Sequence, residues 1–279
     1  RTGRKTIKST TGLDLTGLFV GSEGVLGVVT EITVKLVPLP EPPATAVAFF
    51  GELAPAGAAI AEVFAQGLEP SVMEVIDRAC LRQVNDVYNM QLDADAALLL
   101  VVQTSGLDAD VAIEAIAGIC RAHGATFVHH VTDPVEGDML IEARRRVWPA
   151  FEKLEKHLLP EDVAVPRERL ADLLTGIEEI RDRHRVQIAT IGHAGDGNLH
   201  PLFIMDPGDA DEIERAKSAF ADVVALSVSL GGTIAAEHGV GTLKRPFIEL
   251  ELDPIQLAVQ RRIRDVLDPH GRFNPGKAL

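Results

Sequence analysis

The feature that most constrains the fold is a strand–helix–strand pattern that occurs twice. Short apolar runs rich in β-branched residues indicate strands, and apolar residues at helical spacing indicate the helices between them. The predicted segments are strand 45–50, helix 55–66 and strand 71–76, and then strand 97–104, helix 108–122 and strand 125–131. Two such runs are typical of a ferredoxin-like α+β domain, in which helices lie on one face of an antiparallel sheet.

Further elements are predicted before and after these runs. Alternating apolar residues at Val29, Ile32, Val34 and Leu36 indicate a strand, and residues 38–44, with four prolines, indicate a linker. The second half predicts helices at 136–158, 166–183, 209–230 and 254–267, hairpin strands at 186–191 and 199–205, and a strand-like segment at 233–236.

Composition excludes several function classes. The formal net charge of -14 argues against a nucleic-acid partner, because phosphate binding needs clustered Lys and Arg. No apolar run approaches the ~20 residues of a membrane helix, and the N-terminus lacks a signal-peptide layout. Cys80 and Cys120 have no metal-binding spacing, which indicates buried thiols and a cytoplasmic location. The chain opens at Arg1 without Met, so we expect a piece of a longer protein.

Residues 192–200, G-H-A-G-D-G-N-L-H, indicate a hairpin with two histidines. Asp196-Gly197 favours a two-residue type I′ turn, which would place His193 directly opposite His200. Opposed residues point to one face with Cβ atoms about 5 Å apart, so both imidazoles can bind one metal ion. Zn²⁺ suits these donors, while Fe, Mn and Co stay open. The alternative interpretation is a surface hairpin that merely carries polar residues.

Glu237 and His238 follow in a second Gly-rich stretch. Glu237 would complete a His/His/carboxylate set with an open position, as in catalytic zinc sites. A neutral imidazole is a good base near pH 7, so we assign proton abstraction to His238. The alternative is that both residues decorate a helix that begins at Val240.

Two further segments allow a structural and a functional interpretation. The loop G-S-E-G-V-L-G at 21–27 lets backbone N–H groups approach a phosphate, but a tight structural turn is an equal alternative. Arg144, Arg145 and Arg146 are typical of a solvated helix face, although one guanidinium can clamp a carboxylate.

Four motifs, in this order, resemble the FAD-linked 2-hydroxy-acid oxidoreductases of the vanillyl-alcohol-oxidase type. This group includes the glycolate oxidase D subunit, FAD-dependent D-lactate dehydrogenases and D-2-hydroxyglutarate dehydrogenase. The motifs are G-S-E-G-V-L-G-V-V-T-E, G-H-A-G-D-G-N-L-H-P, A-A-E-H-G-V-G-T-L-K-R and L-D-P-H-G-R-F-N-P-G-K.

The resemblance implies a domain division and a set of site residues. Residues 1–37 would be the end of an FAD-binding domain whose N-terminal part is missing, and residues 45–279 the C-terminal substrate or cap domain, with the tail 268–279 returning to the flavin. The metal ligands would be His193, His200 and Glu237, the active-site base His238, and the carboxylate-binding residue Arg144. The residues contacting FAD would be Glu23, Gly24, Val25, Leu26, Gly27, Val28, Val29 and Asn274.

Departures from the pattern limit the substrate. Relatives that oxidise a dicarboxylic hydroxy acid carry Lys, Asn and a small hydroxyl residue where this chain has Pro160, Leu202 and Trp148. We therefore expect a 2-hydroxy monocarboxylic acid of the D-lactate or glycolate type, with electrons passing from FAD to an electron acceptor or partner subunit. Any membrane contact would be peripheral, and the chain by itself would be inactive. The competing hypothesis is a non-catalytic metal-binding subunit or interaction module of a flavoprotein complex.

Overall fold

The computed structural model describes residues 1–279 and shows two compact units. The sheet unit comprises residues 38–233, and the terminal unit comprises residues 1–37 together with 234–279. No helix in either unit combines the length and the apolar composition that a membrane crossing requires.

The sheet unit is built on one eight-stranded antiparallel sheet in the order β4-β1-β3-β2-β7-β8-β5, with β6 paired to β8. The strands are β1 (Ala44–Phe50), β2 (Val72–Asp77), β3 (Leu98–Thr104), β4 (Phe127–Val131), β5 (His157–Pro160), β6 (Val163–Ala164), β7 (Gln187–His193) and β8 (Asn198–Met205). The first four strands take the order β4-β1-β3-β2, as two strand–helix–strand runs require in a ferredoxin-like unit. The predicted α+β class with an antiparallel sheet is confirmed.

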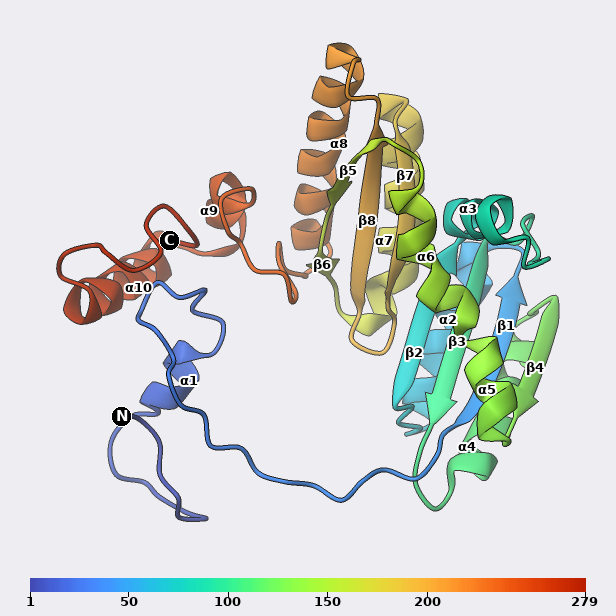
Figure 1. The fold of residues 1–279 in the computed structure, drawn as a ribbon, viewed down its shortest axis with the longest axis horizontal. Coiled ribbons are helices and arrows are strands. Elements are labelled where there is room, and N and C mark those ends of the chain that lie inside the picture. Colours follow the sequence, from blue (N-terminus) through green and yellow to red (C-terminus); the bar gives the residue numbers. More distant parts are fainter. The chain divides into compact units, whose positions relative to one another are not determined.

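Helices cover both faces of this sheet, not only one (Figure 1). One layer holds α2 (Leu53–Ala65), α4 (Ala109–Ala122), α7 (Leu170–His184) and α8 (Ala210–Ser229). The opposite face carries α3 (Arg78–Tyr88), α5 (Pro134–Leu140) and α6 (Glu142–Glu152). The predicted single helical layer was therefore incomplete. Because every residue of β1 is buried, both of its faces are apolar and need cover.

The second layer forms its own part of the core. Val47 and Phe49 of β1 pack with Leu81 of α3 and Phe151 of α6 in one cluster. Phe50, the next residue along β1, points to the other face because strand side chains alternate. These contacts hold α3 and α6 against this face of the sheet.

Three local predictions were wrong. The helix expected at 136–158 is two helices followed by β5, because Glu155 adopts a φ of 51° and the chain then pairs with β8. The strand expected around Val29–Leu36 has no partner strand in the structure, and Ile32 is 77% exposed. The strand-like segment at 233–236 makes only one bridge, from Thr233 to Ala164. In each case the presence or absence of pairing with a distant strand, and not the local apolar pattern, decided the secondary structure.

The terminal unit has three short or medium helices: α1 (Leu15–Phe19), α9 (Ile248–Glu251) and α10 (Pro254–Leu267). Val25, Leu26 and Ala278 are buried together, with Phe19 and Ile263 packed against them. This small cluster joins the Gly-rich loop of residues 21–27 to the C-terminal tail, although the two are far apart in sequence.

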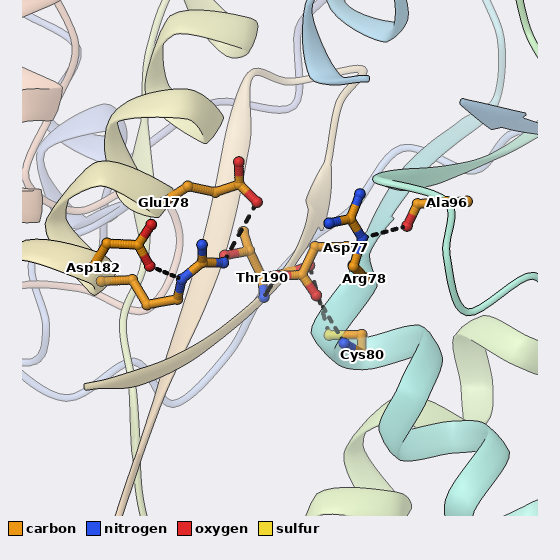
Figure 2. A network of polar contacts seen from close by, with 8 residues as sticks. Asp77, Arg78, Cys80, Ala96, Glu178, Asp182 and Thr190 are labelled. Carbon is orange, nitrogen blue, oxygen red and sulfur yellow. Dashed lines mark hydrogen bonds and ion pairs between the residues drawn. The ribbon is translucent and has the colours of Figure 1, made fainter. Parts of the chain in front are cut away.

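Asp77 connects three elements of the sheet unit beside the candidate site. Its Oδ1 accepts the Cys80 N–H at 2.8 Å, which caps α3, and its Oδ2 accepts the Thr190 N–H of β7 at 2.6 Å. Figure 2 shows the carboxylate between these two groups. Burial raises the pKa of the Asp77 carboxyl to about 6, against the lowering effect of the two N–H donors.

The raised pKa predicts a pH-dependent contribution to stability. The folded protein binds this proton more tightly than the unfolded chain, so the stabilising contribution is complete below pH 3.8 and is lost as the pH rises through about 6. Asp77→Asn removes the titration. We expect the difference in unfolding free energy between wild type and this variant to be largest near pH 4 and to narrow towards pH 7, as measured by urea unfolding.

Asp133→Asn is the matched control for this experiment. Asp133 is an exposed N-cap residue that accepts the N–H groups of Val135 and Glu136 at the start of α5. A constant difference between wild type and Asp77→Asn across this pH range would contradict the assignment to Asp77.

Candidate functional site

The hairpin of β7 and β8 carries both predicted metal-binding histidines, but its register differs from the prediction. His193 pairs with Asn198, and His200 pairs with Ile191. The turn therefore spans the four residues between His193 and Asn198, with the Asp196 N–H donating to the His193 carbonyl oxygen at 3.0 Å. The predicted pairing of His193 with His200 was wrong by two residues, because residues 194 and 195 belong to the turn and not to the strand.

A two-residue shift leaves the two histidines on the same face of the sheet, since strand side chains alternate with a period of two. Their rings are edge to face with centroids 5.1 Å apart. The predicted approach of His193 and His200 is thus observed, on a diagonal rather than in direct opposition.

Each histidine has a buried carboxylate beside its Nδ1 atom. Glu74 lies opposite His193 in the β2–β7 register, and its Oε1 is 2.5 Å from His193 Nδ1. Asp162, which is fully buried between β5 and β6, places its Oδ1 3.6 Å from His200 Nδ1. Metal-binding histidines commonly use one ring nitrogen for a carboxylate and the other for the metal, and the hydrogen bond between His193 Nδ1 and Glu74 matches this arrangement.

Of the three residues Arg144–Arg146, Arg144 is the one that bonds to a side chain of the candidate site. Its Nε donates to Glu74 Oε2 at 2.6 Å, whereas Arg145 and Arg146 pair with Asp138 and Glu142 near the surface. Burial alone would raise the pKa of Glu74, but the hydrogen bonds from His193 and Arg144 outweigh it and hold that pKa below its ordinary value. Glu74 therefore stands as a carboxylate between two donors.

A cavity of about 450 Å³ opens beside Glu74 and His193. Its walls come from the loop between α2 and β2 and from the hairpin turn at Gly195 and Asp196. Arg167 also lines it and stacks over the Phe64 ring with 4.2 Å between the guanidinium carbon and the ring centroid. The volume falls within the range of small-molecule sites.

Three of the sequence motifs meet inside the terminal unit. The Glu23 carboxylate accepts the N–H groups of Val240 and Gly241 at 2.7 and 2.8 Å, and Asn274 Nδ2 donates to the Glu23 carbonyl oxygen at 2.5 Å. Glu23 and Gly24 both adopt positive φ, 51° and 75°. The Gly-rich loop is thus fixed by hydrogen bonds of Glu23, a residue that the family resemblance predicted to contact FAD.

Glu237 and His238 also lie in the terminal unit, shortly before Val240 and Gly241 in sequence. Their side chains approach to 3.7 Å between His238 Nε2 and Glu237 Oε1. Val240 begins only a single hydrogen-bonded turn, closed by the Lys244 N–H at 3.1 Å, and the next helical element is the 3₁₀ helix Arg245–Phe247, so the predicted alternative of a helix that begins at Val240 is wrong.

The predicted residues therefore fall into two sets. His193, His200 and Arg144 come together in the sheet unit, and a second set lies in the terminal unit: Glu23–Val29, Glu237, His238 and Asn274. Sequence reasoning missed Glu74 and the role of Asp162. The available signal for Glu74 was a charged residue in the otherwise apolar run V-M-E-V-I, since buried charges are rare unless paired.

Comparison with known proteins identifies the family. The model of the family "FAD linked oxidases, C-terminal domain" matches residues 39–278. Glycolate oxidase subunit GlcD of Bacillus subtilis is 37% identical over 99% of this chain and 59% of its own length, and GlcD of Escherichia coli K12 is 32% identical over 96% and 54%. A probable mitochondrial D-lactate dehydrogenase of Danio rerio is 29% identical over 99% and 56%. The chain spans little more than half the length of these relatives.

Solved structures agree on the fold. p-Cresol methylhydroxylase with substrate bound has a TM-score of 0.68 at 12% identity, over 98% of this chain and 61% of the other. 4-Ethylphenol oxidase from Gulosibacter chungangensis has a TM-score of 0.65 at 16% identity, over 97% and 59%. With a family match over most of its length and the expected α+β fold, this chain belongs to the FAD-linked oxidases and contains their C-terminal domain.

Proposed function

We propose that this protein oxidises a 2-hydroxy monocarboxylic acid of the glycolate or D-lactate type to the 2-oxo acid, with FAD and a divalent metal, zinc by preference. The observation that carries the proposal is the arrangement of His193 and His200, each backed by a buried carboxylate, beside Arg144 in a member of the FAD-linked oxidases. The similarity to a glycolate oxidase subunit and to a probable D-lactate dehydrogenase supports the substrate class.

The donor set in the sheet unit fits a metal ion. The two imidazoles lie on adjacent antiparallel strands, and the bond from His193 Nδ1 to Glu74 favours the tautomer of His193 with a lone pair on Nε2. Asn198 is the cross-strand partner of His193, so its side chain lies on the same face of the sheet. Its Oδ1 is buried and has no hydrogen-bond partner. We propose Glu237 as the third ligand. When bound, the metal supplies a Lewis acid that lowers the pKa of the substrate hydroxyl.

Arg144 is proposed to hold the substrate carboxylate. A guanidinium binds a carboxylate bidentately, and the bond from Nε to Glu74 fixes the orientation of its plane. The restriction to one carboxylate rests on Pro160 and Leu202, which are paired directly across β5 and β8. Two apolar side chains at this point offer a second carboxylate no cationic partner.

His238 is proposed to accept the hydroxyl proton at an imidazole nitrogen. FAD, when bound, supplies the acceptor for the hydride that leaves the α-carbon. In the terminal unit, Glu23 and Asn274 fasten the Gly-rich loop, so we propose that this loop contacts the cofactor through its backbone. The electrons then pass to an electron acceptor or a partner subunit.

Metal analysis of the full-length protein tests the ligand assignment. We expect an equimolar amount of zinc or a similar divalent ion in the wild type, and loss of most of it in His193→Ala and in His200→Ala, because each removes one of few ligands. His129→Ala, on the exposed face of the edge strand β4, is the matched control and should retain the metal. Equimolar metal in both ligand variants would show that the assignment is wrong.

Anaerobic flavin reduction tests the substrate class. D-Lactate or glycolate should bleach the flavin absorbance of the full-length protein, whereas a dicarboxylic 2-hydroxy acid of similar length should do so at least ten times less efficiently, measured as kcat/KM. The physical reason is the desolvation of a second carboxylate without a cationic partner. Equal efficiency for both classes would overturn the monocarboxylic assignment.

A further inference from the structure

Glu74 links two groups to which the proposed function gives separate tasks. Its Oε1 contacts His193 Nδ1 at 2.5 Å, and its Oε2 accepts Arg144 Nε–H at 2.6 Å. We propose that Glu74 is a positioning residue that holds the metal-binding imidazole and the carboxylate-binding guanidinium in one fixed unit. This inference rests on the proposed function of His193 and Arg144.

The three residues come from distant parts of the chain and meet on one face of the sheet. Glu74 lies on β2, its register partner His193 lies on β7, and Arg144 reaches them from α6. The Glu74 side chain is 10% exposed, and Arg144 is 29% exposed. A buried carboxylate that accepts two hydrogen bonds is held firmly. Breaking either bond would leave part of its charge buried without a partner, which costs free energy.

The two bonds have defined consequences for the two partners. A carboxylate at Nδ1 keeps the proton there, so that His193 presents a lone pair at Nε2. A guanidinium whose Nε is engaged still offers the edge formed by Nη1 and Nη2 to a second carboxylate. Because Glu74 bonds to both residues, it fixes the position of a metal on His193 relative to that of a carboxylate on Arg144.

Glu74 is better suited to this role than to that of a metal ligand. Each of its oxygens already accepts a short hydrogen bond, and its carboxylate lies at Nδ1, the ring nitrogen away from the proposed metal. A purely structural role in a buried strand would be met by an apolar residue at no cost in desolvation. Two donors on one carboxylate indicate that orientation is what this residue provides.

Glu74→Gln is the test variant, because an amide keeps the size of the side chain but has only one acceptor oxygen. Either His193 or Arg144 then faces an amide N–H₂ group. Glu142→Gln is the matched control, since Glu142 forms its ion pairs with Arg145 and Arg146 on α6, whereas Arg144 pairs with Glu74. Glu74→Asp, which shortens the reach, serves as the second variant if the amide fails to fold.

Three readouts on the full-length protein separate positioning from general stability. Competition with a chelator should show zinc affinity about 10- to 100-fold weaker in Glu74→Gln than in wild type. KM for D-lactate should rise by about ten-fold or more, because the Arg144 anchor loses its orientation. Nitrogen chemical shifts of ¹⁵N-labelled histidine in zinc-free protein should report His193 as the Nδ1–H tautomer in wild type and a tautomer mixture in the variant.

The outcomes distinguish this inference from the proposed function. Unchanged zinc affinity, KM and His193 tautomer in a folded Glu74 variant would overturn the positioning role while leaving the metal site intact. If wild type binds no zinc, the metal part of the proposed function fails, and the tautomer and KM readouts then decide the role of Glu74 alone. The inference is supported when all three readouts change in the Glu74 variants and none changes in Glu142→Gln.

Discussion

His238→Asn in the full-length protein is expected to lower turnover of the 2-hydroxy acid by about 10²- to 10⁴-fold, the typical contribution of a general base. Asparagine keeps a polar side chain of comparable length but has no basic nitrogen near neutral pH. The metal should remain bound, because the proposed ligand next to His238 is Glu237. Single-turnover flavin reduction and metal analysis on the same sample measure the two effects separately.

The pair of measurements also decides between two roles for this residue. Loss of metal together with activity would identify His238 as a ligand and not as the base. Turnover at the wild-type rate would remove it from the mechanism altogether. His123→Asn, at the C-terminal end of α4, is a suitable control for replacing a histidine outside either predicted set.

Gly192→Ala is expected to destabilise the protein by about 3 kcal/mol or more, because the added carbon overlaps main-chain atoms of the partner strand. A Cβ atom at Gly192 would lie 2.3 Å from the Asn198 carbonyl oxygen and 2.7 Å from Leu199 Cα. Relief requires β7 and β8 to move apart at the residue that precedes His193. We therefore expect lost metal as well as a lower urea midpoint.

Gly195→Ala, in the turn of the same hairpin, is the matched control for this prediction. Its Cβ would meet Met73 Cβ at 3.7 Å, an ordinary van der Waals contact. We expect a change in unfolding free energy within about 1 kcal/mol for this variant. Unfolding of Gly192→Ala at the same urea concentration as Gly195→Ala would contradict the predicted overlap.

Much of the sheet unit could be read from local patterns. The two strand–helix–strand runs, the long helix α8 and both hairpin strands occur where apolar periodicity predicts them, within a few residues. The periodicity could not show that β5 pairs with β8, or that α3, α5 and α6 cover the second face. Those features depend on hydrogen bonds and packing between segments far apart in sequence.

The candidate site divides in the same way. That His193 and His200 share a face of the hairpin could be predicted from their positions in the two strands, because a register shift of two residues leaves the face unchanged. Their buried carboxylate neighbours, in contrast, became visible only in the folded chain. Glu74 meets His193 across 119 residues and Arg144 across 70. Such contacts follow from strand order and helix packing, which no local pattern encodes.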